Sequence, residues 1–514
     1  MAIKASIPLL FLLAAGLLFA AAVGTSKEEE GRRGEQWEHQ HGKQGRGREG
    51  EQEQEQEQDS RRPYVFGPRS FQRIVRSDHG SVEALRPFNE ESRLLRGIKN
   101  YRVTIIKANP RSFIVPGYPD ADTISYVVQG EGVVTLIENG EKRSYTVRQG
   151  DVVVAPAGTI RHLANTDGRR KLIVANILHT ISVPGKFQYF LGESLVSSLS
   201  KRVQRAAFKS PEERLEKLFG RQRKKQRFIV RASEEQVREF LRHASEGGQS
   251  HHWPFGGDSR STYNLLEQRP TIANRHGRLY EVDARSFRAL ADQDVRVAFA
   301  NITAGSMTAP YYNTQSVKIA LVLEGEGEVE IVCPHLSQER QRQQQGQSER
   351  GKGRGREEED DEREQQHQQK GRGSGSESES EEQQQQQQKY ETIRARVSPG
   401  SAFVVPPGHP VVEISSSRGS NNLQVVCFEI NAQKNERVWL AGKNNVLGKL
   451  DRPAKELTFG APAREIDAVL DAQQDEGFFA GPEQQQGQGE EEWRHRGRGE
   501  EAVESFLRMA TSAF

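Results

Sequence analysis

Short apolar runs between turn residues are the dominant pattern of this chain. Runs rich in Val, Ile and Leu occur at residues 102–106, 151–155, 172–175 and 423–427, separated by Gly, Pro and Asn. Their spacing of roughly ten residues is typical of antiparallel sandwiches and barrels. The pattern therefore predicts a mainly β fold.

Two helical segments follow the strand-rich regions. The first is predicted to begin at Ser210 as the cap, with Pro211 in the first turn. The second covers residues 463–472. In both segments apolar residues recur at helical spacing and form one face. These residues are Leu215, Leu218 and Phe219 in the first segment and Ile466, Val469 and Leu470 in the second.

The strand-rich region is duplicated. Residues 125–138 are similar to residues 320–333, and residues 147–158 are similar to residues 397–408. The second copy has a wider spacing because a low-complexity tract follows Cys333. A repeat that survives such an insertion indicates an internally duplicated domain, with the insertion in a surface loop.

Apolar residues are concentrated in these repeats, although they make up only 34% of the 514 residues. Residues 338–388 contain 16 Gln and 7 Arg but no Val, Ile, Leu, Met, Phe, Tyr or Trp. Such a segment cannot bury enough apolar surface to offset an ordering cost of roughly 1–2 kcal/mol per residue, so we expect disorder.

The predicted organisation is a signal peptide at 1–24, a disordered Glu/Gln/Arg/Gly-rich segment at 25–62, an N-terminal barrel with a helical extension at 63–245, a linker at 246–262, a C-terminal barrel with a helical extension at 263–480 interrupted by the disordered insertion 338–388, and a low-complexity tail at 481–514.

Charge and hydropathy exclude two classes of partner. The chain has 73 basic and 71 acidic residues and a formal net charge of +2, whereas a nucleic-acid binder carries a large basic excess. An apolar run at residues 7–23 follows Lys4 and ends in small residues, which is the pattern of a cleaved secretory leader. No later run approaches the roughly 18 apolar residues that span a membrane. We therefore expect the mature protein to bind neither nucleic acid nor membrane.

Three residues could carry covalent modifications. Two cysteines are too few for a disulfide framework, and both Cys333 and Cys427 fall on predicted strands of the second repeat. A disulfide between them and two buried thiols are both compatible with the sequence. Asn301 begins an Asn-Ile-Thr sequon and is a possible N-glycosylation site, although it lies in a strand-like run.

Both repeats carry a motif of Gly, five residues, Pro, one residue and Gly. The motif is formed by Gly150, Pro156 and Gly158 in the first repeat and by Gly400, Pro406 and Gly408 in the second. Further characteristic segments occur at residues 211–220, 310–313, 438–445, 450–455 and 478–482. With these features, residues 65–482 resemble the cupin superfamily and, more closely, its vicilin-type (7S) seed storage globulins of the cereal embryo kind. The resemblance implies two double-stranded β-helix (jelly-roll) barrels.

Many cupins are metal enzymes, and the resemblance indicates where their ligands would lie. The glutamate position holds Thr123 and Lys318, and the second-motif histidine position holds Arg161 and Val411. The upstream histidine pair, counted with either spacing, falls on Gly117 and Pro119 or Pro116 and Tyr118 in the first repeat, and on Tyr312 and Thr314 or Tyr311 and Asn313 in the second. His162 and His409 are displaced by one and two residues, and a displacement of one residue turns His162 away from the barrel. We therefore expect no catalytic residue, no metal site and no cofactor.

The resemblance implies a seed storage protein without catalytic activity. Such a protein would travel through the secretory pathway to the protein storage vacuole or protein bodies of the seed embryo or aleurone, and processing proteases would degrade it at germination. The resemblance also implies a homotrimer, with the six apolar helix residues named above as contact candidates. One alternative is a binding module that holds a sugar or small organic ligand in a barrel. A less favoured alternative is a metal-dependent bicupin oxidase or decarboxylase.

Overall fold

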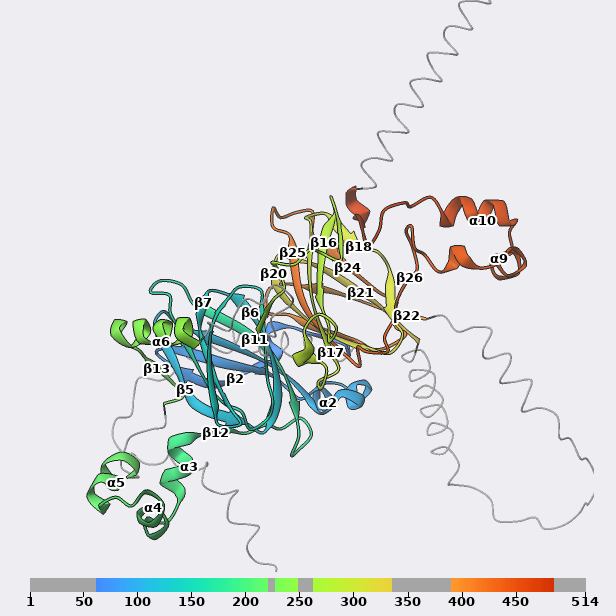
Figure 1. Cartoon of the computed structure of the whole chain (residues 1–514). Coiled ribbons are helices and arrows are strands. Elements are labelled where there is room, and N and C mark those ends of the chain that lie inside the picture. The colour runs from blue at the N-terminus through green and yellow to red at the C-terminus, as the bar shows by residue number, and fades with distance from the viewer. Residues whose placement is uncertain (1–61, 221–226, 248–261, 335–389, 485–514) are drawn as a thin grey trace, which may run out of the picture. The chain divides into compact units, whose positions relative to one another are not determined.

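The computed structural model describes residues 62–220, 227–247, 262–334 and 390–484 (Figure 1). The predicted signal peptide 1–24, the disordered segment up to residue 61, the insertion 338–388 and the tail beyond residue 484 lie outside the described residues. The described chain forms two units of antiparallel strands, each made of two sheets, and each unit is followed by helices. The predicted mainly β fold with two barrels is confirmed.

The N-terminal barrel consists of a seven-stranded and a six-stranded sheet. The first has the order β14-β9-β6-β11-β4-β3-β2, and the second has the order β12-β5-β10-β7-β8 with β13 also paired to β5. Its strands are β2 (Phe71–Ser77), β3 (Gly80–Leu85), β4 (Tyr101–Ala108), β5 (Ser112–Pro119), β6 (Ala121–Gln129), β7 (Glu131–Glu138), β8 (Glu141–Arg148), β9 (Asp151–Ala155), β10 (Ile160–Asn165), β11 (Leu172–Thr180), β12 (Tyr189–Leu191), β13 (Ile229–Arg231) and β14 (Thr262–Asn264).

The C-terminal barrel repeats this arrangement with two seven-stranded sheets. One has the order β1-β23-β20-β25-β17-β16-β15, and the other has the order β22-β21-β24-β18-β27, with β19 paired to β24 and β26. Its strands are β1 (Val65–Phe66), β15 (Ile272–Asn274), β16 (Gly277–Val282), β17 (Val295–Ile302), β18 (Ser306–Thr308), β19 (Tyr311–Asn313), β20 (Val317–Glu324), β21 (Gly327–Cys333), β22 (Glu391–Val397), β23 (Ala402–Val405), β24 (Val411–Ser415), β25 (Leu423–Ile430), β26 (Arg437–Trp439) and β27 (Phe478–Ala480).

The two halves of the chain exchange a strand. Strand β1 precedes the N-terminal barrel in sequence, yet it pairs with β23 of the C-terminal barrel. Strand β14 follows the N-terminal helices and pairs with β9 of the N-terminal barrel. Each exchanged strand covers the edge of a sheet whose N–H and C=O groups would otherwise be open for pairing. Strands β1 and β14 therefore do not follow the predicted boundaries at residues 63 and 263, since each pairs with the barrel on the other side of its boundary. A short apolar run does not specify its partner strand, so the sequence did not show this.

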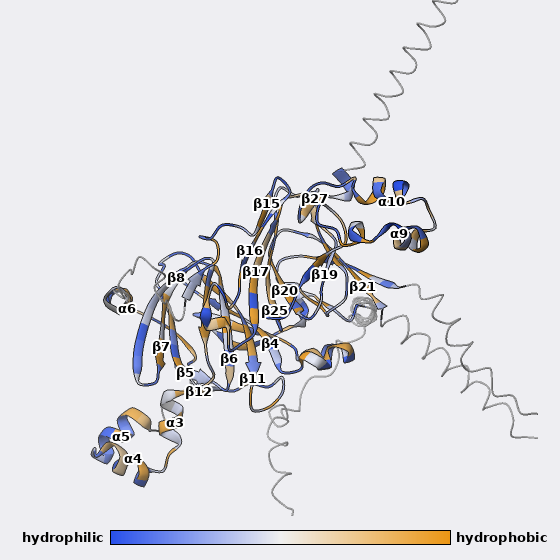
Figure 2. Ribbon diagram, turned by 45° about the vertical axis from the view of Figure 1, so that its right-hand side comes forward, coloured by the Kyte–Doolittle hydropathy of each residue, from blue (hydrophilic) through white to orange (hydrophobic). Residues whose placement is uncertain are grey.

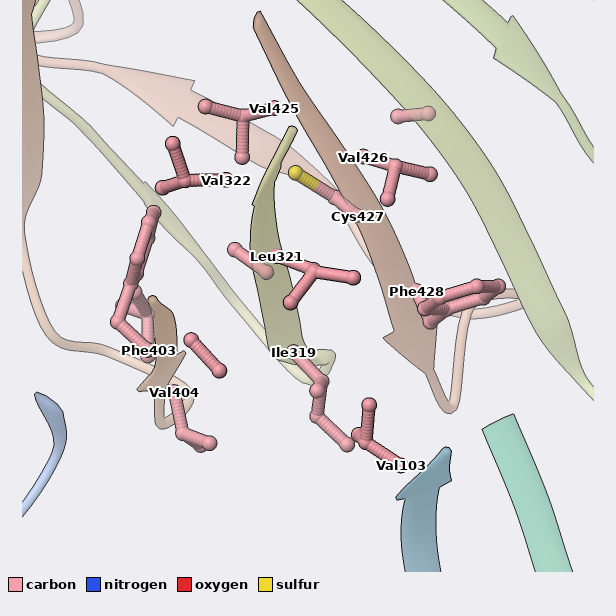
Figure 3. Packing of buried hydrophobic residues seen from close by; sticks show 14 of the residues in the cluster. Val103, Ile319, Leu321, Val322, Phe403, Val404, Val425, Val426, Cys427 and Phe428 are labelled. Atoms are coloured by element: carbon pink, nitrogen blue, oxygen red, sulfur yellow. The ribbon is translucent and has the colours of Figure 1, made fainter. Parts of the chain in front are cut away.

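A continuous apolar core joins the two barrels. Tyr126 of β6 and Phe299 of β17 stack with ring centroids 6.1 Å apart. Val103 of β4 belongs to the same cluster of buried residues as Ile319 and Phe403, as Figure 3 shows. A second cluster, which includes Val134, lies within the N-terminal barrel alone. The halves therefore share buried apolar surface, which is the dominant stabilising contribution in folding.

The two repeats share a Gly-Glu-Gly segment, at residues 130–132 and 325–327, whose first glycine is required by close backbone contacts. Gly130 has φ of +86°, and a Cβ at this position would lie 2.4 Å from the carbonyl oxygen of Lys171. Gly325 has φ of +78°, and its Cβ would lie 2.3 Å from the carbonyl oxygen of Asn422. These glycines therefore occupy tight strand connections where L-residues would be strained.

Along the chain, the helices lie between the strands of the two barrels. They are α2 (Phe88–Glu91), α3 (Gly192–Ser198), α4 (Lys201–Phe208), α5 (Glu212–Phe219), α6 (Glu234–Gly247), α9 (Arg452–Phe459) and α10 (Ala463–Leu470), with short 3-10 turns at Pro68–Ser70, Arg93–Ile98, Arg288–Leu290 and Leu447–Lys449. The prediction that Ser210 caps α5 is wrong, because Pro211 occupies the N-cap and no side chain caps the helix. Within the described residues, no helix has the length and apolar character needed to cross a membrane.

Candidate functional sites in the two barrels

The positions that hold metal ligands in cupin enzymes lie on equivalent strands of the two barrels. Thr123 on β6 pairs with Ala155, and Lys318 on β20 pairs with Val405. Arg161 on β10 and Val411 on β24 occupy the second pair of positions. In the part of the chain that the structure describes, no group of three or more His, Cys, Asp or Glu residues could hold a metal ion. The residues at these positions lack the carboxylate and imidazole donors that such a site requires.

The C-terminal barrel instead contains a buried ion pair. Lys318 Nζ forms a salt bridge with Glu413 Oε1, and both residues are almost fully buried. Lys318 Nζ also donates a hydrogen bond to Tyr311 Oη at 2.7 Å and lies 5.4 Å from the centre of that ring. Burial disfavours the charged ammonium, but its neighbours, with Glu413 among them, outweigh burial and raise the pKa of Lys318 well above its ordinary value.

A second set of charges adjoins this pair. Arg437 Nη2 donates to Glu281 Oε1 and to Glu429 Oε1 at 2.8 Å each. Arg296 Nη1 lies 3.4 Å from Glu429 Oε2. Burial opposes ionisation of Glu429, but the charges of Arg437, Arg296 and Lys318 outweigh burial and lower the pKa of this carboxyl.

The C-terminal barrel therefore neutralises its own charges. Among the described residues of its interior, the cations Arg296, Lys318 and Arg437 face the carboxylates of Glu281, Glu413 and Glu429. The cavity beside them has a volume of about 20 Å³. A cavity of this size has room for about one water molecule. The filled interior leaves no space for an organic ligand.

The N-terminal barrel has an open interior. A cavity of about 610 Å³ lies between its two sheets, within the usual size range of ligand pockets. Most of its lining is apolar, and it includes Val82, Val127, Val134, Leu136, Val153 and Val174. Among the described residues that line it, Arg102, Arg161 and Lys186 are charged and none is an Asp or Glu.

The two arginines of this cavity differ in their partners. Arg102 donates to the backbone oxygens of Leu85 and Gly185, so its guanidinium is well satisfied. Arg161 Nη2 donates to Thr123 Oγ1 at 3.0 Å, and the Tyr189 phenol lies beside it. Burial lowers the pKa of Arg161, and the contact with Tyr189 opposes this shift. Among the described residues, no carboxylate pairs with Arg161.

The two displaced histidines lie in packed environments. His162 contacts the rings of Phe113 and of Phe240 on α6, at centroid distances of 5.2 and 5.6 Å. Burial, with a smaller contribution from Lys142, lowers the pKa of His162 to about 4. His409 is buried, and its ring packs edge-on against Tyr64 at 5.7 Å. Among the described residues, neither histidine belongs to a group of three or more His, Cys, Asp or Glu residues that could hold a metal ion.

The modification candidates are buried or within a sheet. Cys333 and Cys427 are both free thiols, and burial raises the pKa of each to about 12. The disulfide alternative is therefore absent from this structure. Asn301 lies in β17, where it pairs with Arg278 of β16 on one side and Gln424 of β25 on the other.

The six predicted trimer contacts divide into two groups. Leu215 and Ile466 are buried within their own helical segments, at 4% and 6% exposure. Leu218 and Val469 are exposed, at 56% and 75%. Phe219 and Leu470 are partly buried. Helices α4 and α9 carry further exposed apolar residues, which are Val203, Phe208, Leu457 and Phe459. Figure 2 shows hydrophobic stretches on α4, α5, α9 and α10.

Sequence reasoning missed the charge network of the C-terminal barrel. It also missed Arg161 of the N-terminal barrel, with which no carboxylate pairs among the described residues. The sequence did show a basic residue, Lys318 or Arg161, at a position that holds a metal ligand in cupin enzymes. This observation excluded both residues as metal ligands, but it did not show which residues they contact. Glu413 lies two residues beyond Val411, and only the strand register shows that its side chain reaches Lys318.

Comparisons with known proteins agree with this geometry. The family model described as Cupin matches residues 66–214 and 263–465. A 63 kDa globulin-like protein of Oryza sativa subsp. japonica is 63% identical over 470 residues, which cover 88% of this chain and 82% of the relative. Globulin-1 S allele of Zea mays is 55% identical over 455 residues, which cover 86% of this chain and 76% of the relative.

A solved structure shows the same fold. The crystal structure of vicilin from Corylus avellana is 38% identical, with a TM-score of 0.67, and the match covers 82% of this chain and all of that chain. The predicted resemblance is therefore confirmed in sequence and in fold. The chain belongs to the cupin family and, within it, to the vicilin-type storage globulins.

Proposed function

We propose that this storage globulin accumulates in seeds as a homotrimer and supplies nitrogen and amino acids at germination. Membership of the vicilin-type globulins supports the storage role. The positions where cupin enzymes hold their metal ligands carry Thr123, Arg161, Lys318 and Val411 in this chain. The Gln- and Arg-rich tract at 338–388 adds side-chain nitrogen at a density that a plain linker does not require.

The exposed apolar residues of the helical extensions support self-association. Leu218 on α5 and Val469 on α10 point to solvent, and Leu457 on α9 is 87% exposed. Helices of eight residues are marginal on their own and usually need a packing partner. The helices of one copy can provide this partner for the helices of another.

A double substitution tests the trimer. Leu218→Asp combined with Val469→Asp places a charge on each of the two helical faces, and we expect monomers by light scattering after size exclusion. Ile181→Asp is the matched control, because Ile181 is 60% exposed but lies outside the helical extensions. The control is expected to remain trimeric. A wild-type monomer, or a double variant that remains trimeric, would contradict the assignment.

We also propose that residues 1–24 direct the chain into the secretory pathway and that its destination is the protein storage vacuole. The basic start, apolar run and small residues of this segment support removal near residues 22–24. Sequencing the N-terminus of the protein purified from seed would test the cleavage. Immunogold labelling of embryo and aleurone sections would test the destination, and label confined to the cytosol would contradict it.

A further inference from the structure

The hairpin between β7 and β8 carries an exposed Asn-Gly sequence at its tip. Asn139 and Gly140 connect the two strands and form the only Asn-Gly pair among the 514 residues. Their φ angles are +51° and +81°, as in the type I′ turn that two-residue hairpins favour. Both residues are exposed, and a Cβ added to Gly140 would meet no atom within 4 Å. The side chain of Asn139 therefore meets no steric obstacle at the amide nitrogen of the next residue.

Hydrogen bonds do not hold this pair of groups in place. Among the described residues, the side-chain amide of Asn139 has no hydrogen-bond partner, and the backbone N–H of Gly140 donates to no backbone oxygen. Glu138 and Glu141 lie directly opposite each other at the end of the ladder, and like charges in such a pair destabilise strand pairing. The tip of the hairpin therefore opens at a lower cost than the rest of the ladder.

A second exposed asparagine lacks these properties. Asn431 has φ of +59°, so its backbone conformation is similar to that of Asn139. The residue that follows it is Ala432, which is buried and whose amide donates to the backbone oxygen of Asp294 at 3.1 Å. The nitrogen beside Asn431 is thus occupied and flanked by a side chain. Asn431 is a matched comparison within the same molecule.

We propose that Asn139 is a site of spontaneous deamidation, which accumulates with the age of the protein. The backbone nitrogen of Gly140 loses its proton and attacks Cγ of Asn139. A bond forms between this nitrogen and Cγ, the bond from Cγ to Nδ2 breaks, and Nδ2 takes up a proton and leaves as ammonia. Water then opens the cyclic succinimide by adding to one of its two carbonyl carbons, whose bond to the Gly140 nitrogen breaks. Opening at Cγ gives aspartate, and opening at the backbone carbonyl gives isoaspartate.

Both products change the tip of the hairpin. The new carboxylate lies between Glu138 and Glu141, so three like charges adjoin. Isoaspartate also adds one carbon to the main chain, which does not fit a two-residue turn. We expect the isoaspartate form to lose the pairing of these glutamates and to expose the peptide bond after Lys142 to proteases. This modification goes beyond the storage role, and the reactive site does not depend on that role.

The test follows the loss of single amides in the full mature chain. The protein is incubated at neutral pH in water labelled with heavy oxygen, then digested and analysed by mass spectrometry. We expect Asn139 to lose its amide at least about tenfold faster than Asn431, which corresponds to about 1.4 kcal/mol of activation free energy. The product should carry one heavy oxygen and include isoaspartate, since direct hydrolysis of the side chain gives aspartate alone.

Surface variants test the two structural requirements. Gly140→Asn keeps a residue that tolerates positive φ but places a side chain beside the nitrogen, so the loss of the Asn139 amide should slow at least about tenfold. Glu138→Lys turns the like-charge pair with Glu141 into an opposite pair and should slow the loss at least about threefold. Glu326→Lys is the charge control, because Glu326 is exposed on the C-terminal barrel and its replacement should leave the rate unchanged.

Each outcome decides the proposal. It is supported if Asn139 reacts faster than Asn431, forms isoaspartate, and slows in Gly140→Asn and Glu138→Lys but not in Glu326→Lys. It is overturned if the two asparagines react at the same rate, if aspartate is the sole product, if Gly140→Asn reacts like wild type, or if Glu138→Lys and Glu326→Lys have equal rates. If Gly140→Asn does not fold, the comparison with Asn431 and the Glu138→Lys variant still decide the matter.

Trypsin digestion of the folded protein tests the expected effect on the hairpin. Incubated wild type should be cut after Lys142 faster than fresh wild type. Asn139→Gly keeps a turn with positive φ but has no amide, so its cleavage should not change with incubation. Equal cleavage of incubated and fresh wild type would refute the predicted opening of the hairpin.

Discussion

The buried pair of Lys318 and Glu413 provides the sharpest test of how the C-terminal barrel is stabilised. Glu413→Gln keeps the size of the side chain and removes its charge. Lys318 then lies in an interior where its side chain is 4% exposed, with the Tyr311 hydroxyl as a hydrogen-bond partner and Glu429 as the nearby carboxylate that remains. A buried charge without its counter-charge is strongly destabilising.

The expected loss is large for a single substitution. Removing one partner of a buried ion pair costs about 3–5 kcal/mol. A change of 1 kcal/mol shifts the melting temperature of a domain of 150–250 residues by about 2–4 °C. We therefore expect the unfolding transition of the C-terminal barrel to fall by roughly 6–20 °C in scanning calorimetry.

Two further variants make the result interpretable. Glu330→Gln breaks the exposed pair with Arg394, whose side chain is 68% exposed, and it should cost less than about 1 kcal/mol. Lys318→Met combined with Glu413→Leu replaces the buried pair by apolar side chains and should recover most of the lost stability. The reasoning is refuted if Glu413→Gln melts like Glu330→Gln, or if the double variant is less stable than Glu413→Gln.

Three other predictions follow from the packing of single residues. Burial lowers the pKa of His162 to about 4, so below pH about 6.5 the unfolded chain binds a proton at this residue more readily than the folded chain does. The free energy of unfolding should therefore fall on the order of 2 kcal/mol as the pH falls towards 4. In urea titrations, His162→Phe should lose this part of the pH dependence. Gly130→Ala should cost about 1–3 kcal/mol because φ is positive and backbone is close by, whereas Gly67→Ala, with no atom within 4 Å of its added Cβ, should be nearly neutral in the same assay. Mass spectrometry should find Asn301 without a glycan, since its strand is paired on both sides, and a glycopeptide that contains Asn301 would contradict this placement.

Local pattern was sufficient to predict the strands and the duplication. The runs at 151–155 and 423–427 become β9 and β25, and the helical spacing at 463–472 becomes α10. These elements depend on residues that are neighbours in sequence. Their periodicity alone therefore identifies them.

Features that depend on distant partners could not be predicted in this way. Nothing in residues 65–66 indicates that they pair with Phe403 and Ala402 in the other half of the chain. The sequence likewise shows Arg161 and Leu163 as one basic and one apolar residue. Only the three-dimensional register shows that Leu163 of the first repeat occupies the position of Glu413, the residue that pairs with Lys318 in the second.

The chain is a storage globulin, and as such it serves as a nutrient reservoir of the seed. The most direct test is its absolute amount, measured by quantitative mass spectrometry through seed maturation, in dry seed, during germination and in vegetative tissue. We expect the protein to be among the most abundant in dry seed, to be nearly absent from leaf and root, and to decline to a small fraction within the period of seedling growth. A low and constant amount in all tissues, or a full amount that persists after the seedling is established, would contradict it.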